Sequence, residues 1–118
     1  MELSLDDYAQ FLQVNLRGLE GRDTSLLKAA TIKHLHTSSV SPPDRYGLGW
    51  GLEDFDGAPA SVHVGSAGTF YAVTIIQPTR DLGVAVFANA GGERATAAST
   101  IAIKALIQRF AKLGPRPR

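Results

Sequence analysis

The sequence predicts an α+β fold, in which an antiparallel sheet of three to four strands carries N-terminal helices and a long C-terminal helix. Three observations predict it. Apolar residues recur with a helical period over residues 4–17, the period changes to two from residue 46, and a helical period returns over residues 94–113. The length of 118 residues fits one domain with a modest core, so we treat residues 1–118 as a single domain.

The first part of the chain predicts two helices and a loop. Ser4 is positioned to cap a helix over residues 4–17, which Gly18 and Gly21 would end. Its apolar stripe consists of Leu5, Tyr8, Leu12 and Leu16. A second helix is expected over residues 25–36, with three residues facing inward: Leu27, Ile32 and Leu35. The serines and prolines of residues 37–45 predict a loop.

The glycine-rich run over residues 46–52 predicts a strand with one apolar and one bare face. Its apolar face consists of Tyr46, Leu48, Trp50 and Leu52, and glycines occupy the positions between them. We expect Tyr46 and Trp50 in the core and the bare face against the C-terminal helix. Further strands are predicted over residues 61–66, 70–77 and 82–88. The short connection between the last two predicts an antiparallel hairpin.

The last segment predicts a long helix over residues 94–113, stopped by Gly114 and Pro115. Its apolar face is expected to consist of Ala98, Ile101, Ala102, Ala105 and Leu106.

Composition excludes several classes of function. Twelve basic and eleven acidic residues leave a net charge of +1, which makes nucleic acid and membranes poor partners. The chain has no cysteine, and His34, His36 and His63 lack metal-ligand spacing, so neither metal nor cofactor is expected. The two first histidines read as surface or half-buried residues. No signal peptide or transmembrane run is predicted, which leaves the location undetermined and a cytoplasmic one as the default expectation.

Five segments in order resemble one known family. They are residues 5–12, residues 26–37, Tyr-Gly-Leu-Gly-Trp at 46–50, His-Val-Gly-Ser-Ala-Gly at 63–68, and residues 77–89. Together they resemble the C-terminal portion of the class C β-lactamase-like family, which includes esterases and D-alanyl-D-alanine carboxypeptidases. The resemblance implies a partial β-lactamase-like fold. It also implies amide, ester or lactam hydrolysis in the parent enzyme.

The resemblance assigns three residues to the substrate and oxyanion side of the site. His63 and Gly65 match the family's third motif, which is Lys-Thr-Gly in many members and His-x-Gly in others. The first residue of the motif would hold a substrate carboxylate or steer a proton, and the glycine would let substrate lie against the strand. The backbone N–H of Ser66 would be one oxyanion-hole donor, typically worth about 3–4 kcal/mol of transition-state stabilisation.

The catalytic half of the family's site is not found in this sequence. The family uses a Ser-x-x-Lys nucleophile and a Tyr-x-Asn or Ser-x-Asn motif, both N-terminal to the third motif. The sequence has one Ser-x-x-Lys, at Ser25 and Lys28, which we interpret as a chance match. A triad of Ser66 with His63 is rejected, because nothing fixes its geometry. A nucleophile elbow over residues 64–68 is rejected too, because it lacks the first glycine and the strand-turn-helix context. No complete catalytic set is therefore predicted.

Two hypotheses follow for the function. In the first, the chain is the C-terminal segment of a serine hydrolase. It would be inactive alone, and a complementary N-terminal fragment would complete it around a small acyl or peptide substrate. In the second, the chain is a non-catalytic binding or self-association module, which forms a homodimer through an exposed sheet edge.

Overall fold

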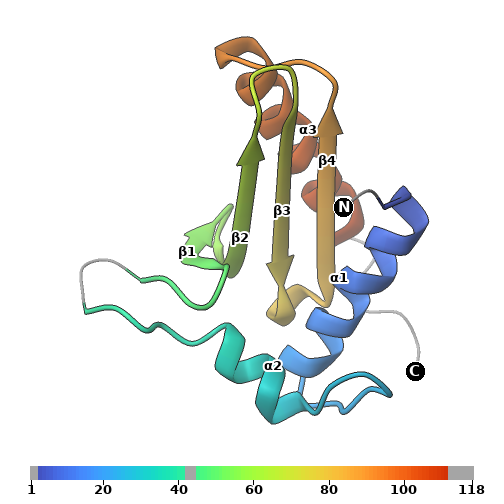
Figure 1. Ribbon diagram of the computed structural model, residues 1–118, viewed down its shortest axis with the longest axis vertical. Coiled ribbons are helices and arrows are strands. Elements are labelled where there is room, and N and C mark those ends of the chain that lie inside the picture. Colours follow the sequence, from blue (N-terminus) through green and yellow to red (C-terminus); the bar gives the residue numbers. More distant parts are fainter. Residues whose placement is uncertain (1–2, 42–44, 112–118) are drawn as a thin grey trace.

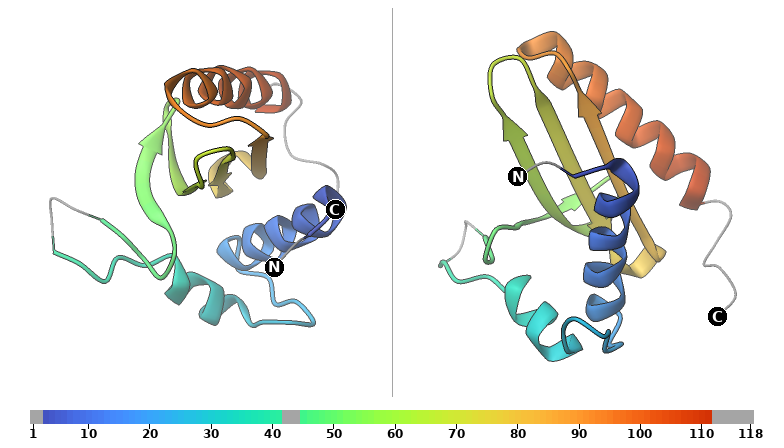
Figure 2. Two further views of the ribbon diagram at one scale, coloured as in Figure 1. Left: turned by 45° about the horizontal axis from the view of Figure 1, so that its top comes forward. Right: turned by 45° about the vertical axis from the view of Figure 1, so that its right-hand side comes forward.

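A computed structural model describes residues 3–41 and 45–111 of the chain. Four strands form one antiparallel sheet in the order β1-β2-β3-β4: Gly51–Phe55, Ala58–Ser66, Tyr71–Gln77 and Leu82–Ala88. Helices α1 (Leu5–Leu19) and α2 (Ala29–Leu35) lie on one side of the sheet, and α3 (Glu93–Ala111) covers the other (Figures 1 and 2). The predicted α+β class is confirmed.

The central strand β3 separates two apolar cores. Tyr71, Val73 and Ile75 pack in the core beneath α3, whereas Ile76 packs with Leu12 of α1. This division follows from the alternation of side chains along a strand, which sends neighbouring residues to opposite faces. The hairpin of β3 and β4 is confirmed as antiparallel. A single 3-10 turn, Pro78–Arg80, connects its two strands.

Helix α1 begins as predicted but does not end at Gly18. The Asp7 N–H donates to Ser4 Oγ over 3.1 Å, so Ser4 is the N-cap. Gly18 is buried inside the helix, and a Cβ there would overlap the Cβ of Ile32. The glycine therefore lets α1 and α2 approach each other closely.

The second helix is shorter than predicted, because a turn precedes it. The N–H of Leu27 donates to Thr24 Oγ1, and the N–H of Ala29 donates to Asp23 Oδ1 over 2.8 Å. These side chains satisfy the backbone in a non-helical conformation, so α2 starts only at Ala29. Leu27 is consequently 39% exposed, whereas Ile32 is buried as expected.

The prediction of a strand over residues 46–52 is wrong for most of its length. Tyr46 pairs with Gly51 through a single bridge, and Gly49 adopts a φ of +89°, which turns the chain before β1 begins. A Cβ on Gly47 would overlap the Leu35 carbonyl oxygen, so this glycine receives the end of α2 and not the C-terminal helix. Trp50 is buried as predicted, but Tyr46 is 47% exposed.

Strand β2 is longer than predicted. It begins at Ala58, because the residues before it form a tight turn: Asp56 and Gly57 have φ values of 48° and 87°. Such positive φ values suit a two-residue hairpin connection, and Phe55 accordingly pairs with Ala58.

The face that α3 turns to the sheet is rotated from the predicted one, although the predicted Leu106 does pack against the core. Its buried residues are Ala95, Ser99, Ile103 and Ile107. Ile101, which we placed in the core, is 70% exposed. Alanines on every side of this helix leave its apolar stripe poorly defined, so the apolar period alone could not determine which face packs on the sheet. No helix within residues 3–41 and 45–111 is both long and apolar enough to cross a bilayer.

Candidate substrate-side site

His63 lies on β2 with an exposed side chain whose orientation is fixed by two contacts. Its Nδ1 lies 3.2 Å from the Gly49 carbonyl oxygen, and its ring lies 6.2 Å from the Trp50 ring in an edge-to-face arrangement. Because a carbonyl oxygen only accepts, Nδ1 carries the proton in this bond. In this tautomer of the neutral imidazole, Nε2 is an acceptor of hydrogen bonds.

Gly65 is two residues further along β2, on the same face of the strand as His63. A Cβ at this position would meet no atom within 4 Å, and its φ is not among the positive values of the chain. Neither backbone conformation nor internal packing therefore requires a glycine here. The missing side chain leaves open space next to His63.

The backbone N–H of Ser66 points away from β3. The Ala67 N–H donates to the Phe70 carbonyl oxygen over 3.2 Å, which makes these two residues a hydrogen-bonded pair of the ladder. Pairs alternate in an antiparallel ladder, so Ser66 and Tyr71 form a non-hydrogen-bonded pair. Strand β1 pairs with β2 only as far as Val62, so the outward groups of Ser66 and Val64 lie on an open edge.

The turn that follows Ser66 rests on the loop after β4. Gly68 has a φ of +70°, and a Cβ on Gly91 would overlap the Gly68 carbonyl oxygen. Gly91 is therefore required by close packing of the two backbones. This contact fixes the β2–β3 turn, and with it the position of Ser66.

A cavity of about 380 Å³ lies beside the open edge of β2. It is lined by Tyr46, Gly51, Glu53, Val62, His63 and Val64. The three polar members carry an imidazole, a carboxylate and a phenol, which give the cavity hydrogen-bonding groups of different kinds. The cavity, the open edge and His63 thus form one candidate binding site.

The other chemistry considered from the sequence is not assembled. His63 and Ser66 are three residues apart on one strand, so their side chains leave opposite faces. Ser25 lies in the turn before α2 and Lys28 caps that helix, so the pair does not share a helical turn. Among the described residues, no three histidines and carboxylates are grouped to hold a metal ion.

His36 is a buried, hydrogen-bonded residue behind Trp50 that sequence reasoning missed. It directly follows α2 and is 7% exposed, whereas His34 is exposed as expected. Its Nδ1 lies 2.7 Å from Ser61 Oγ, its Nε2 lies 2.9 Å from Asn15 Oδ1, and its ring stacks on Trp50 at 4.7 Å. Burial lowers the pKa of His36 from 6.5 to about 4. No local pattern signals these partners, because they lie 21 and 25 residues away in the sequence.

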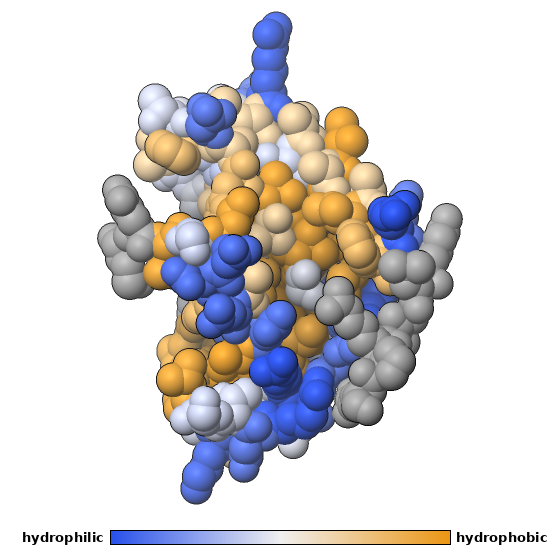
Figure 3. All heavy atoms as spheres, turned by 90° about the vertical axis from the view of Figure 1, so that its right-hand side faces the viewer, coloured by the Kyte–Doolittle hydropathy of each residue, from blue (hydrophilic) through white to orange (hydrophobic). Residues whose placement is uncertain are grey.

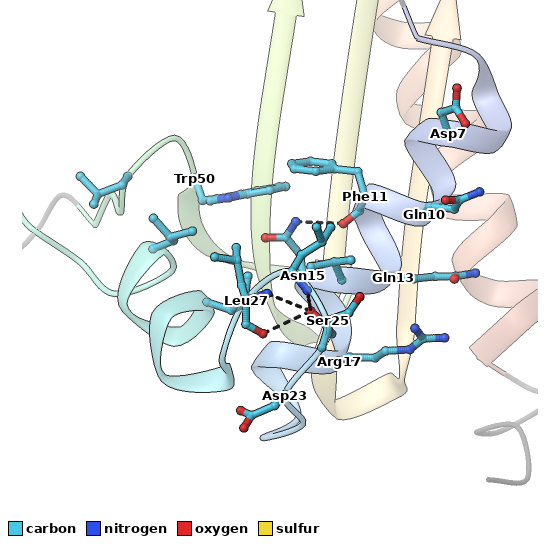
Figure 4. A pocket seen from close by; sticks show the side chains of 16 residues that line it. Asp7, Gln10, Phe11, Gln13, Asn15, Arg17, Asp23, Ser25, Leu27 and Trp50 are labelled. Atoms are coloured by element: carbon cyan, nitrogen blue, oxygen red, sulfur yellow. Dashed lines mark hydrogen bonds between the residues drawn. The ribbon is translucent and has the colours of Figure 1, made fainter.

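A second, larger cavity of about 820 Å³ lies between α1, the turn before α2, and Trp50. Figure 4 shows Phe11, Asn15, Leu27 and Trp50 around it, while Gln10 and Gln13 point away. Phe11 and Trp50 are stacked with ring centroids 6.4 Å apart. Trp50 therefore forms part of this cavity and also supports both histidine rings.

Comparisons with known proteins agree with this geometry. Residues 3–108 match the Beta-lactamase family, and the chain belongs to that family. It is similar to a solved structure, the octameric penicillin-binding protein homologue from Pyrococcus abyssi, with 26% identity and a TM-score of 0.71. That match covers 89% of this chain but 24% of the other, so this chain spans about a quarter of that protein's length. No curated protein matches.

Proposed function

We propose that this chain is the C-terminal segment of a β-lactamase-like serine hydrolase and supplies the substrate side of its site. In this role, His63 holds an acyl or peptide substrate through its imidazole and Gly65 leaves room for the substrate to lie along β2. The Ser66 N–H donates to the oxyanion that forms on the substrate carbonyl.

The open edge of β2 is the observation that carries this proposal. Antiparallel alternation directs the Ser66 N–H outward where β1 no longer covers the strand. An extended peptide can add to such an edge through main-chain hydrogen bonds. Gly65, which neither φ nor packing requires, leaves clearance at the same point. Both features suit a ligand that comes from outside the chain.

Nucleophilic attack in this proposal belongs to a serine outside these 118 residues. Ser25 and Lys28 do not share a helical turn, and proton transfer from a serine requires a base within hydrogen-bond reach. We therefore expect the purified chain to hydrolyse a chromogenic β-lactam and 4-nitrophenyl acetate no faster than its Ser25→Ala variant does. Turnover that is lost in Ser25→Ala would refute the assignment of the nucleophile elsewhere.

Binding tests the substrate-side role without requiring turnover. An acylated D-alanyl-D-alanine dipeptide should shift the ¹H–¹⁵N resonances of Val64 and Ser66 in a concentration-dependent way. The Gly65→Val variant should lose these shifts, because its side chain fills the space beside the strand. An Ile101→Ala variant, changed on the exposed face of α3 away from β2, serves as the control and should keep the shifts. Shifts that avoid β2 would contradict the proposed role.

The opposite edge of the sheet supports a second function, self-association. Hydrogen-bonded and non-hydrogen-bonded pairs also alternate between β3 and β4. This alternation directs the backbone N–H and C=O groups of Gly83, Ala85 and Phe87 away from β3. Phe87 is 43% exposed. Figure 3 shows this side of the molecule, with a broad apolar area at its centre. An edge strand beside an apolar surface is a template for pairing with another chain.

Sedimentation over a range of concentrations tests this second function. We expect a dimer that the Ala85→Pro variant weakens, because proline removes an outward N–H without touching the bonds to β3. Circular dichroism checks that the variant folds. If it does not, Phe87→Lys places a charge on the same edge and should also weaken the dimer. A wild-type chain that stays monomeric at high concentration would rule self-association out.

A further inference from the structure

His36 joins three parts of the molecule that are distant in the sequence. Its partners are Asn15 on α1, Ser61 on β2 and Trp50 in the segment between α2 and β1. Asn15 and Ser61 are 3% and 6% exposed, so the whole cluster is shielded from water. The imidazole is thus a buried polar link between the α1–α2 layer and the sheet, in addition to the hydrogen bond between Tyr8 of α1 and Thr74 of β3.

The hydrogen bonds define which nitrogen of His36 carries the proton. Asn15 Nδ2 donates to the Phe11 carbonyl oxygen over 3.0 Å, a bond drawn in Figure 4, so Asn15 presents Oδ1 to the ring. An amide oxygen only accepts, hence His36 Nε2–H donates to it. Nδ1 then has a lone pair and accepts the hydroxyl proton of Ser61. The neutral ring satisfies every partner.

A proton can add only to Nδ1, where it breaks this arrangement. Nδ1–H and the Ser61 hydroxyl would then be two donors facing each other, and the hydroxyl would have to turn into a buried environment. The groups in contact with the ring are neutral: Asn15 from α1, Ser61 from β2, and Trp50. His63 lies beyond Trp50, and no carboxylate among the described residues is hydrogen-bonded to the ring. The stacked Trp50 ring favours a cation, yet burial outweighs it, because the pKa of His36 falls.

We propose that His36 is a pH-sensitive latch, which holds α1 and α2 against the sheet as a neutral imidazole and releases them when Nδ1 takes up a proton. Release also moves Trp50, which lies between His36 and His63 and lines the cavity between the two helices. Acidification would therefore remove the aromatic support of His63. This inference does not depend on the substrate proposed above.

The direction of the pH effect follows from the two pKa values of His36. In the released state the ring has its ordinary pKa of 6.5, and in the latched state its pKa is about 4. The latched state is therefore favoured fully above pH 6.5. Its advantage falls by up to tenfold per pH unit below that, by roughly 160-fold at pH 4 and by at most roughly 300-fold well below pH 4.

Trp50 is the sole tryptophan of the sequence, so its fluorescence reports on the latch directly. We expect its emission to shift to longer wavelength between pH 6.5 and 4 while the far-ultraviolet circular dichroism of the sheet persists. The His34→Gln control, exposed on the same helix, and the His63→Gln control, on the other side of Trp50, should keep this transition. His36→Gln should abolish it.

Three outcomes would overturn the latch. One is a transition retained in His36→Gln, and a second is a transition lost in His63→Gln. The third is loss of all secondary structure in the same pH step, which would be unfolding and not release. Should His36→Gln fail to fold, the Cε1–H resonance of His36 in the wild-type chain decides: titration near pH 6.5 without a change in Trp50 emission refutes the proposal.

Discussion

The hydrogen bond between Tyr8 and Thr74 offers a quantitative test of how α1 is fixed near His63. The Tyr8 hydroxyl lies 2.6 Å from Thr74 Oγ1, and Thr74 is the register partner of His63 on the neighbouring strand. Thr74 is 1% exposed, whereas Tyr8 is half-buried. The two ends of one bond therefore differ in their access to water.

This difference predicts unequal costs for the two single substitutions. Tyr8→Phe leaves the Thr74 hydroxyl buried without this partner, which costs about 1–3 kcal/mol of the free energy of unfolding. Thr74→Val leaves the Tyr8 hydroxyl, which water can reach, so about 0.5–1 kcal/mol is expected. The double variant replaces both polar groups by apolar ones. It should therefore lose at least about 1 kcal/mol less than the sum of the single variants.

Urea unfolding followed by circular dichroism measures all four proteins, with the midpoint compared at constant slope. Gln13→Ala, on the exposed side of the same helix, is a control that keeps the Tyr8–Thr74 bond. Additive losses in the double variant would show that the two hydroxyls do not interact. A larger loss in Thr74→Val than in Tyr8→Phe would contradict the assignment of burial.

Two further matched pairs test the fold and the site. Ile103→Ala should lower the free energy of unfolding by about 2–5 kcal/mol in thermal or urea denaturation, because Ile103 is 0% exposed on the face of α3 that packs on the sheet. Ile101→Ala, on the exposed face of the same helix, should change it by less than about 0.5 kcal/mol. Equal effects would mean that α3 turns another face to the sheet. Gly91→Ala should destabilise by about 1–3 kcal/mol, because its Cβ overlaps the Gly68 carbonyl oxygen, whereas Gly65→Ala should leave the unfolding midpoint unchanged. A strongly destabilised Gly65→Ala would give that glycine a structural role.

The order of elements could be predicted from the sequence because each depends on local signals. Ser4 caps α1 through a contact three residues away, and the hairpin of β3 and β4 needs only a short connection. The predicted apolar stripe of α1 is also confirmed at Leu12, which is buried. The class α+β, which follows from these periods alone, is therefore correct.

The sequence predictions fail where the role of a residue is set by a contact that is distant in the sequence. The sequence predicts a helix end at Gly18, but a glycine is needed there because Ile32 packs against it. Likewise, Gly47 is predicted to lie in a strand, but a glycine is needed there because the end of α2 packs against it. Glycine has the same local signature whether it provides a positive φ or close approach, so sequence could not separate these cases. His36 fails for the same reason, because its environment comes from α1 and β2.

The two open edges of the sheet differ in what they can accept. On β2 the open stretch is short, from Val64 to Ser66, and it lies between the exposed imidazole of His63 and the clearance at Gly65. Such a stretch suits a small extended ligand that needs few main-chain bonds. On β4 the open edge runs the length of the strand beside an apolar surface, which suits a further strand. In the proposed function, substrate binding and completion of the sheet would therefore use opposite edges, and occupancy of one would not obstruct the other.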